Sequence, residues 1–524
     1  MSTKVMNIIK NRNIWAVLAI LCLAFLIRIN TFWIPHWQGD QSQYLSLALK
    51  LDTFGFTEYN LRGINIQYFS PKGDTDICII FPVIAKDKDS TGVILTALEG
   101  AGGRRYDTPL YHLPPAFPYA IMLSHKIFTQ KNTPYLSIES NKKITRNHVL
   151  FKTQFYSVIV PLFFDIGMIL CTFFIGKTLY NNRVGLYASL MLTLNAVNIL
   201  SSQRLWADTM LSFFVTLSIL LFVLSMNQKR QLLFIFLSGI SAGIAILCKQ
   251  TAGFYVFAII SFIIITNEKW YTLLTGLIIA LLTGSFITKE PFFFFMLDNT
   301  SFLLFFYVIS FFRIKEEKDV FNLKNIRYVF DKKLLVFVIP IILVTGFWFL
   351  SMFTQTGDAL FLPKQSANKF ILTKDIKLWN NILFERPEGR FLYFIGIPII
   401  FPLFFFAYIS IKDFLYNLIQ TLTKKNSDHR FIILWLIILF FFYNLGNNRE
   451  HRLMLPTYSC FAILSAYMLD KFQCWSGKFS SQIIVSQKSR TLIVWIFFII
   501  CAIWSIKIGL QTTLSNALLI KVPF

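Results

Sequence analysis

A single carboxylate stands just beyond the first apolar stretch of the chain. That stretch covers residues 14–32, and Asp40 follows it. Four apolar residues then recur with the spacing of one helical face: Tyr44, Leu47, Ala48 and Leu51. This stripe predicts a helix that lies in the plane of a membrane interface, half in lipid and half in water. A carboxylate at its N-terminal edge could act as a general base on a hydroxyl in water, or it could cap the helix, which Asp favours.

A second segment with chemical potential contains a pair of arginines, followed by a histidine and a pair of prolines. Arg104 and Arg105 could hold a phosphate between two guanidinium groups, or could rest on anionic headgroups. They precede His112 and a Pro-Pro pair that opens a predicted helix over 114–128, where proline suits the first turn.

An acid and a base also stand close together in the short stretch 202–209. Arg204 and Asp208 could contact a substrate there, although Asp208 could equally cap the helix that follows. Asp165 lies inside an apolar run, where a carboxylate is costly unless it is paired or faces a wet cavity.

The composition of the chain shows which kind of structural element must position these residues. Of 524 residues 55% are hydrophobic and 15% are charged, against about 25% charged in an ordinary soluble domain. An all-α polytopic membrane protein is therefore predicted, which excludes a soluble enzyme and a disulfide scaffold. Thirteen apolar runs are long enough to be spans: 14–32, 151–178, 184–201, 209–226, 232–248, 251–266, 270–288, 291–312, 334–353, 391–411, 431–445, 453–470 and 491–510.

The distribution of positive charge predicts the orientation. If 114–128 does not cross the membrane, the loops on the N-terminal side carry 22 Lys and Arg, and the opposite loops after the second span carry 12. Crossing would reverse this bias, so the positive-inside rule favours an interfacial 114–128, with the N-terminus in the cytoplasm and the C-terminus outside. The net charge of +23 then reflects cytoplasmic loops, and no nucleic-acid partner is expected.

This topology divides the chain into seven parts. They are the N-terminal tail with the first span (1–32), the outer catalytic loop (33–150), spans two to eight (151–312), a basic cytoplasmic loop (313–333), the ninth span (334–353), a second outer loop (354–390) and the last spans (391–524).

Taken in order, these motifs resemble the GT-C superfamily of polyprenyl-phosphate-sugar glycosyltransferases, and most closely the branch with the protein O-mannosyltransferases and the lipid A aminoarabinose transferase. The matching segments are Asp40 to Ala48, Pro114 to Tyr119, Lys177 to Asp208, Gly239 to Lys249, Arg390 through Tyr393 to Pro402, and Arg452 to Pro456. The chain departs from the family pattern at Gln41 and Ser42. The second acid and an Asp-x-Asp metal pair are therefore missing from the first loop, and Asp208 is the best remaining partner for a divalent metal.

The resemblance implies an inverting transferase that moves a sugar from a polyprenyl-phosphate donor to a lipid, polysaccharide or protein acceptor. Asp40 is expected to be the base, and Asp208 a second catalytic carboxylate. The residues expected to contact substrate are Tyr44, Arg104, Arg105, His112, Arg204, Lys249, Arg390, Tyr393, Arg449 and Arg452. Each cation could instead be snorkelling at a helix end. No cofactor is predicted with a defined site, and the expected location is the outer, periplasmic face of a bacterial inner membrane.

Two rival functions remain open. A transporter or flippase of lipid-linked sugars would bind the same lipid at the basic rim without chemistry. A polysaccharide polymerase or ligase usually carries its large outer loop late in the chain, whereas here that loop follows the first span.

Overall fold

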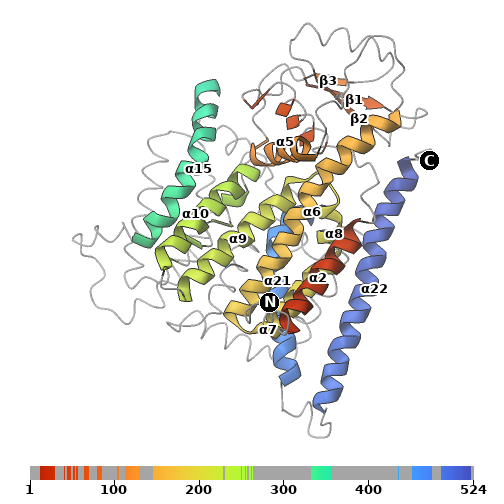
Figure 1. Ribbon diagram of the computed structural model, residues 1–524, viewed down its shortest axis with the longest axis vertical. Helices are drawn as coiled ribbons and strands as arrows, with labels where there is room; N and C mark the ends of the chain where they lie inside the picture. Colours follow the sequence, from red (N-terminus) through yellow and green to blue (C-terminus); the bar gives the residue numbers. More distant parts are fainter. Residues whose placement is uncertain are drawn as a thin grey trace, which may run out of the picture.

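The protein is a bundle of long apolar helices with smaller elements at one end (Figure 1). The computed structural model describes residues 12–29, 64–69, 79–84, 103–105, 113–128, 146–227, 230–249, 332–356, 451–474 and 486–520, with Trp435 and scattered positions in 41–59 and 251–263. The helices are α2 (Arg12–Ile29), α5 (Ala116–Phe128), α6 (Arg146–Leu179), α7 (Asn182–Thr193), α8 (Ala196–Ser202), α9 (Ala207–Asn227), α10 (Gln231–Cys248), α15 (Lys332–Thr356), η2 (His451–Met454), α21 (Leu455–Cys474) and α22 (Gln487–Ile520).

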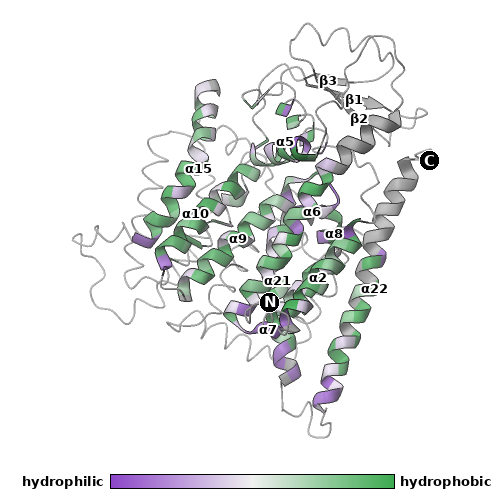
Figure 2. Ribbon diagram, in the orientation of Figure 1, coloured by the Kyte–Doolittle hydropathy of each residue, from purple (hydrophilic) through white to green (hydrophobic). Residues whose placement is uncertain are grey.

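Within the described part of the chain, four helices are long and apolar enough to cross a membrane. These segments are Tyr156–Leu179, Ala207–Met226, Gln231–Cys248 and Lys332–Thr354. Apolar residues cover the long helices (Figure 2), and side chains such as Phe163 and Leu343 are about 70% exposed, as lipid-facing residues are. The predicted helical membrane architecture is confirmed. The predicted spans 270–288, 291–312, 391–411 and 431–445 lie outside the described residues, apart from Trp435.

The predicted span 184–201 is wrong as a continuous helix. The chain forms α7 and then α8, with a break at Leu194 and Asn195. The side chain of Asn195 accepts a hydrogen bond from the Asn198 N–H at 2.9 Å and so caps a new helix. An asparagine that competes for backbone groups in this way ends one helix and starts another, although the apolar run continues.

Elements of the first outer loop lie at one end of the bundle. α5 lies across the ends of the long helices, as an interfacial segment would (Figure 1). It is joined to α6 by a hydrogen bond from the Ser124 hydroxyl to the Tyr156 carbonyl, and by a 2.8 Å contact between His125 Nε2 and Ser157 Oγ. At about 20 Å long it is too short to span a bilayer.

The loop also contains a small sheet that the sequence analysis did not predict. Strands β1 (Ile64–Phe69), β2 (Ile79–Ile84) and β3 (Gly103–Arg105) form an antiparallel sheet in the order β2-β1-β3. Gln67 pairs with Phe81 on one side and with Gly103 on the other.

The stripe after Asp40 is helical at its described positions, but it does not face lipid as expected. Tyr44, Leu47, Ala48 and Leu51 are all 5% exposed or less and belong to the protein core. The Tyr44 ring stands edge-on to Phe117 of α5, with ring centres 5.1 Å apart. This segment therefore buries its apolar face against the rest of the protein.

Small residues and hydroxyls join the helices, as is usual where apolar side chains gain nothing by leaving lipid. A Cβ at Gly239 of α10 would lie 2.3 Å from the Phe337 carbonyl of α15, and one at Gly243 would meet Val344 at 2.9 Å. Ser218 of α9 and Ser238 of α10 bond to each other and to each other's carbonyls. α10 is thus fixed between α9 and α15.

Candidate functional site

Three segments that are far apart in the chain bring one carboxylate and two cations together. Asp208 lies in the first turn of α9, Lys249 directly follows α10, and Arg452 lies in η2 just before α21. Lys249 Nζ is 2.7 Å from one carboxylate oxygen of Asp208, and Arg452 Nε is 3.9 Å from the other. The Asp208 side chain is only 2% exposed, so this ion-pair network is removed from bulk solvent.

A third cation joins through Trp206. The guanidinium carbons of Arg204 and Arg452 each lie 4.8 Å from the centre of the Trp206 ring, within the range of a cation–π contact. Burial, and then the nearby charge of Arg452, lowers the pKa of Arg204 to about 10, so it stays charged at neutral pH. Among the described residues, Arg204 Nε is buried and has no hydrogen-bond acceptor.

We call Arg204, Lys249 and Arg452, with Asp208 and Trp206, the cation cluster. Among the described residues it holds three positive charges and one negative charge, and its cations are partly buried. Uncompensated charge in such surroundings is unfavourable unless an opposite charge is supplied. The arrangement therefore suits an anion, and phosphate oxygens are the usual partners of clustered Arg and Lys.

Local structure holds the cluster residues in place. The Arg204 N–H donates to the Ser201 carbonyl at the end of α8, and the Trp206 N–H donates to the Arg204 carbonyl at 2.7 Å. α10 ends at Cys248, and Lys249 is its C-cap. The Lys249 N–H donates to the Ala245 carbonyl, and the Lys249 carbonyl accepts from the Ala252 N–H. Asp208 is not the N-cap of α9. It lies inside the first turn, where a negative charge is favourable.

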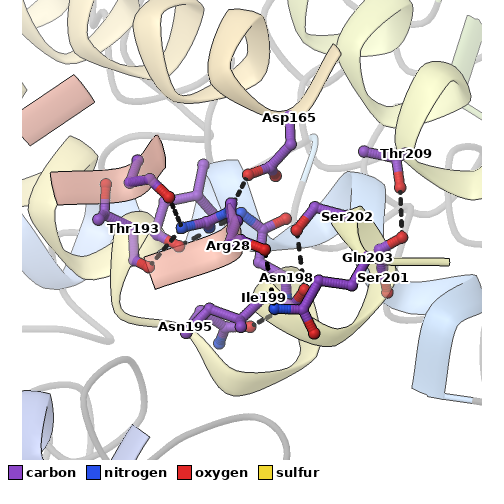
Figure 3. Close-up of polar contacts among 12 residues, drawn as sticks. Arg28, Asp165, Thr193, Asn195, Asn198, Ile199, Ser201, Ser202, Gln203 and Thr209 are labelled. Carbon is purple, nitrogen blue, oxygen red and sulfur yellow. Dashed lines mark hydrogen bonds and ion pairs between the residues drawn. The ribbon is translucent and has the colours of Figure 1, made fainter. Parts of the chain in front are cut away.

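Asp165 has a buried partner that the sequence analysis did not identify. Arg28 Nε lies 2.5 Å from Asp165 Oδ2, and both side chains are completely buried (Figure 3). Arg28 Nη1 also donates to the carbonyls of Ala24 and Thr193 at 3.2 Å. The pair joins the end of α2 to the middle of α6 and to the break between α7 and α8. The only sequence signal was the presence of one charge in each of two apolar runs.

Two glutamines connect the N-terminal part of the chain to the loop of the cation cluster. Gln203 Nε2 donates to the Arg28 carbonyl at 3.4 Å, and the Leu205 N–H donates to Gln41 Oε1 at 3.3 Å. Gln41 and Gln203 are 2% and 3% exposed. In the sequence, Gln41 stands out only as a departure from the GT-C pattern, and Trp206 belongs to no motif that marks it as a site residue.

Of the predicted site residues, Asp208, Arg204, Lys249 and Arg452 come together. Tyr44 is buried against Phe117 and is not among the described contacts of the cluster. Arg104 and Arg105 lie on β3, with side chains outside the described part of the chain. The others lie outside the described residues altogether: Asp40, His112, Arg390, Tyr393 and Arg449.

The structure thus defines an integral membrane protein in which three cations gather at one end of the helix bundle, counted over the residues described. Residues 147–295, which include Arg204, Asp208 and Lys249, match a family model described as dolichyl-phosphate-mannose-protein mannosyltransferase. Among curated protein sequences, none matches the chain.

Two solved structures share the fold at low sequence identity. One is the oligosaccharyltransferase AglB of Archaeoglobus fulgidus in complex with an inhibitory peptide and a dolichol-phosphate (TM-score 0.51, 12% identity, 97% of this chain and 56% of AglB). The other is ArnT of Cupriavidus metallidurans bound to undecaprenyl phosphate (TM-score 0.50, 10% identity, 97% of this chain and 77% of ArnT). The chain thus spans little more than half the length of AglB. These two structures confirm the expected GT-C-like fold.

Proposed function

We propose that this protein transfers a sugar from a polyprenyl-phosphate donor to an acceptor hydroxyl or amine at the outer face of the membrane, with inversion at the anomeric carbon. The observation that carries the proposal is the cation cluster, in which Lys249 and Arg452 contact Asp208 and Arg204 joins them through Trp206. Support comes from ArnT and AglB, which share the fold and whose structures contain lipid phosphates.

The reaction requires groups that stabilise the negative charge of the departing phosphate and a base that removes the proton of the acceptor. The acceptor oxygen or nitrogen attacks the anomeric carbon, the bond from that carbon to the phosphate oxygen breaks, and the electron pair leaves with the lipid phosphate. Cations that bind the phosphate stabilise the negative charge that grows on it in the transition state. In the proposal, Lys249, Arg452 and Arg204 take this role.

The proton of the acceptor needs a base. Asp208 is poorly suited, because its two oxygens already face Lys249 and Arg452. The same contacts leave it little room for a divalent metal. In the proposal, Asp208 therefore holds the cations in place. Asp40, which belongs to the first outer loop, remains the proposed base.

The test uses the full-length protein in vesicles. Undecaprenyl phosphate should raise its unfolding temperature, whereas the uncharged undecaprenol should not, because only the first presents an anion. Mass spectrometry of glycolipids and glycoproteins from cells with and without the gene then identifies the product, whose anomeric configuration follows from NMR.

The same vesicles separate transfer from transport. A transferase consumes undecaprenyl-phosphate-linked sugar and produces undecaprenyl phosphate, whereas a flippase moves the lipid between leaflets unchanged. Movement without consumption, in the presence of the acceptor identified from cells, would replace the proposed enzyme with a transporter.

A further inference from the structure

One aromatic ring of the cation cluster is shared by two arginines that come from distant parts of the chain. The guanidinium carbons of Arg204 and Arg452 each lie 4.8 Å from the centre of the Trp206 ring. Arg204 stands two residues before Trp206, whereas Arg452 belongs to η2, which precedes α21. The two guanidinium carbons therefore cannot be farther apart than twice that distance, and both contact the same ring.

Two guanidinium groups in such proximity repel each other. Burial, and then the charge of Arg452, lowers the pKa of Arg204 to about 10. The contact of Arg452 Nε with the Asp208 carboxylate is 3.9 Å long, which is longer than a charge-assisted hydrogen bond. The face of an indole ring carries partial negative charge, so Trp206 attracts both guanidinium groups and opposes their repulsion.

The Trp206 ring is attached to a backbone that is itself fixed. The Trp206 N–H donates to the Arg204 carbonyl at 2.7 Å, and the Arg204 N–H donates to the Ser201 carbonyl at 3.3 Å. α9 begins at the next residue, and its Thr209 hydroxyl donates to the same Ser201 carbonyl at 3.2 Å (Figure 3). A tryptophan side chain has only two rotatable bonds, so on this backbone its ring can hold a longer and more flexible arginine.

We propose that Trp206 is a positioning residue for the donor phosphate: its ring holds the guanidinium groups of Arg204 and Arg452 near each other in the cation cluster before the lipid binds. This inference rests on the proposed function, in which these cations bind the lipid phosphate. Side chains that are already in place bind a ligand more tightly than side chains that must be ordered on binding, because ordering costs conformational entropy.

The experiment compares side chains with and without a ring. Trp206→Phe keeps an aromatic face, whereas Trp206→Leu and Trp206→Met remove it, so that one ring-free variant remains if the other does not fold. Tyr467→Leu is the matched control, because it removes a ring whose centre lies 5.3 Å from Lys471 Nζ. Tyr467 lies roughly 20 Å along α21 from η2. The folded full-length protein in vesicles is titrated with undecaprenyl phosphate, and with undecaprenol as the uncharged comparison.

For the ring-free variants we expect undecaprenyl phosphate to bind roughly 5- to 30-fold more weakly than to the wild type, because two cation–π contacts are lost. Trp206→Phe should bind at least about threefold more tightly than Trp206→Leu, since a phenyl face still attracts cations. Tyr467→Leu should bind like the wild type. Wild-type affinity in the ring-free variants, or an equal loss in Trp206→Phe or in Tyr467→Leu, overturns the proposal.

A second comparison tests whether Trp206 acts through the two arginines. In a protein that carries both Arg204→Met and Arg452→Met, Trp206→Leu should no longer change the affinity for undecaprenyl phosphate, because the ring has neither guanidinium group to hold. An undiminished effect of Trp206→Leu in that protein would mean that the ring contacts the lipid directly, and it would overturn the positioning role.

Chemical modification separates this inference from the proposed function. Phenylglyoxal modifies arginine side chains, and mass spectrometry of the lipid-free protein gives its rate of reaction at Arg204 and at Arg452. Trp206→Leu should raise both rates, because it releases both guanidinium groups. If the rates rise but the wild-type protein binds undecaprenyl phosphate no better than undecaprenol, the ring contact is real, and both the donor site and the positioning role are overturned. If the wild type prefers undecaprenyl phosphate while Trp206→Leu changes neither rates nor affinity, only the role of Trp206 is wrong.

Discussion

Asp208 and Lys249 are 41 residues apart in the chain, yet Lys249 Nζ lies 2.7 Å from the Asp208 carboxylate. The contact joins the start of α9 to the end of α10, two helices that pack side by side (Figure 1). Both charges lie at helix ends on the same end of the bundle, whereas the remainder of each helix is apolar.

Removing cluster cations should weaken binding of the lipid phosphate. Lys249→Met and Arg452→Met each remove a charged hydrogen-bond donor, worth about 1.5–3 kcal/mol, so binding of undecaprenyl phosphate should fall roughly 10- to 100-fold. Arg452→Lys should keep part of the affinity, because charge remains while the fork geometry is lost. Lys177→Met, a charge change at the far end of α6, is the control and should bind normally. Equal affinity in all four variants places the phosphate elsewhere.

Asp40→Asn should abolish turnover and leave the fold intact. Asn caps a helix about as well as Asp, so a capping role predicts almost no effect. Loss of a general base costs roughly 10²–10⁴-fold in kcat, with donor KM nearly unchanged. Asp208→Asn, measured in parallel, should mainly raise donor KM, since it releases Lys249. A fully active Asp40→Asn enzyme would remove Asp40 from the mechanism.

The buried pair Arg28–Asp165 should be far more sensitive to single changes than to a double change. Asp165→Leu leaves Arg28 charged and buried, which should cost about 3–5 kcal/mol of stability. In Arg28→Met with Asp165→Leu no buried charge remains, so much of that loss should return. Unfolding temperatures in detergent give the comparison. If the double variant is less stable than both single variants, the stability lost in the single variants does not come from an unpaired buried charge, and the prediction is wrong.

A glycine-to-alanine pair tests the packing of α10 on α15. Gly239→Ala would place a Cβ 2.3 Å from the Phe337 carbonyl and force the helices apart, so we expect a clear fall in unfolding temperature. Gly346→Ala in α15 meets nothing within 4 Å and should be neutral or stabilising by up to about 1 kcal/mol. Equal unfolding temperatures for the two variants would contradict the observed helix contact.

The predicted orientation can be measured by cysteine labelling. A cysteine at Thr75, in the first loop, should react with an impermeant thiol reagent from outside, and one at Lys324 should not. Both positions lie outside the described residues, and the expectation comes from the 22 against 12 positive charges on the two sides. Labelling only at 324 would invert the topology and move Asp40 to the cytoplasm.

The sequence by itself determined the class of protein and most helix positions. Runs such as 209–226 and 232–248 are too apolar and too long for anything but helices in a membrane, and α9 and α10 lie where they were predicted. Hydropathy says little about polar details within a run, which is why the break at Asn195 was missed. The strands β1 and β2 were missed for another reason: each is only six residues long, far shorter than a membrane span.

Only the tertiary structure decided which charges meet. Charge and position in the sequence suggested each of four residues separately as a site residue: Arg204, Asp208, Lys249 and Arg452. For each, a role at a helix end was an equally good explanation: capping for Asp208 and snorkelling for the cations. Their contacts join α9, α10 and η2, and they depend on helix packing set by small residues such as Gly239. The same holds for Arg28 with Asp165 and for Gln41 with Leu205, since a buried charge or amide reveals its need for a partner but not which partner the fold supplies.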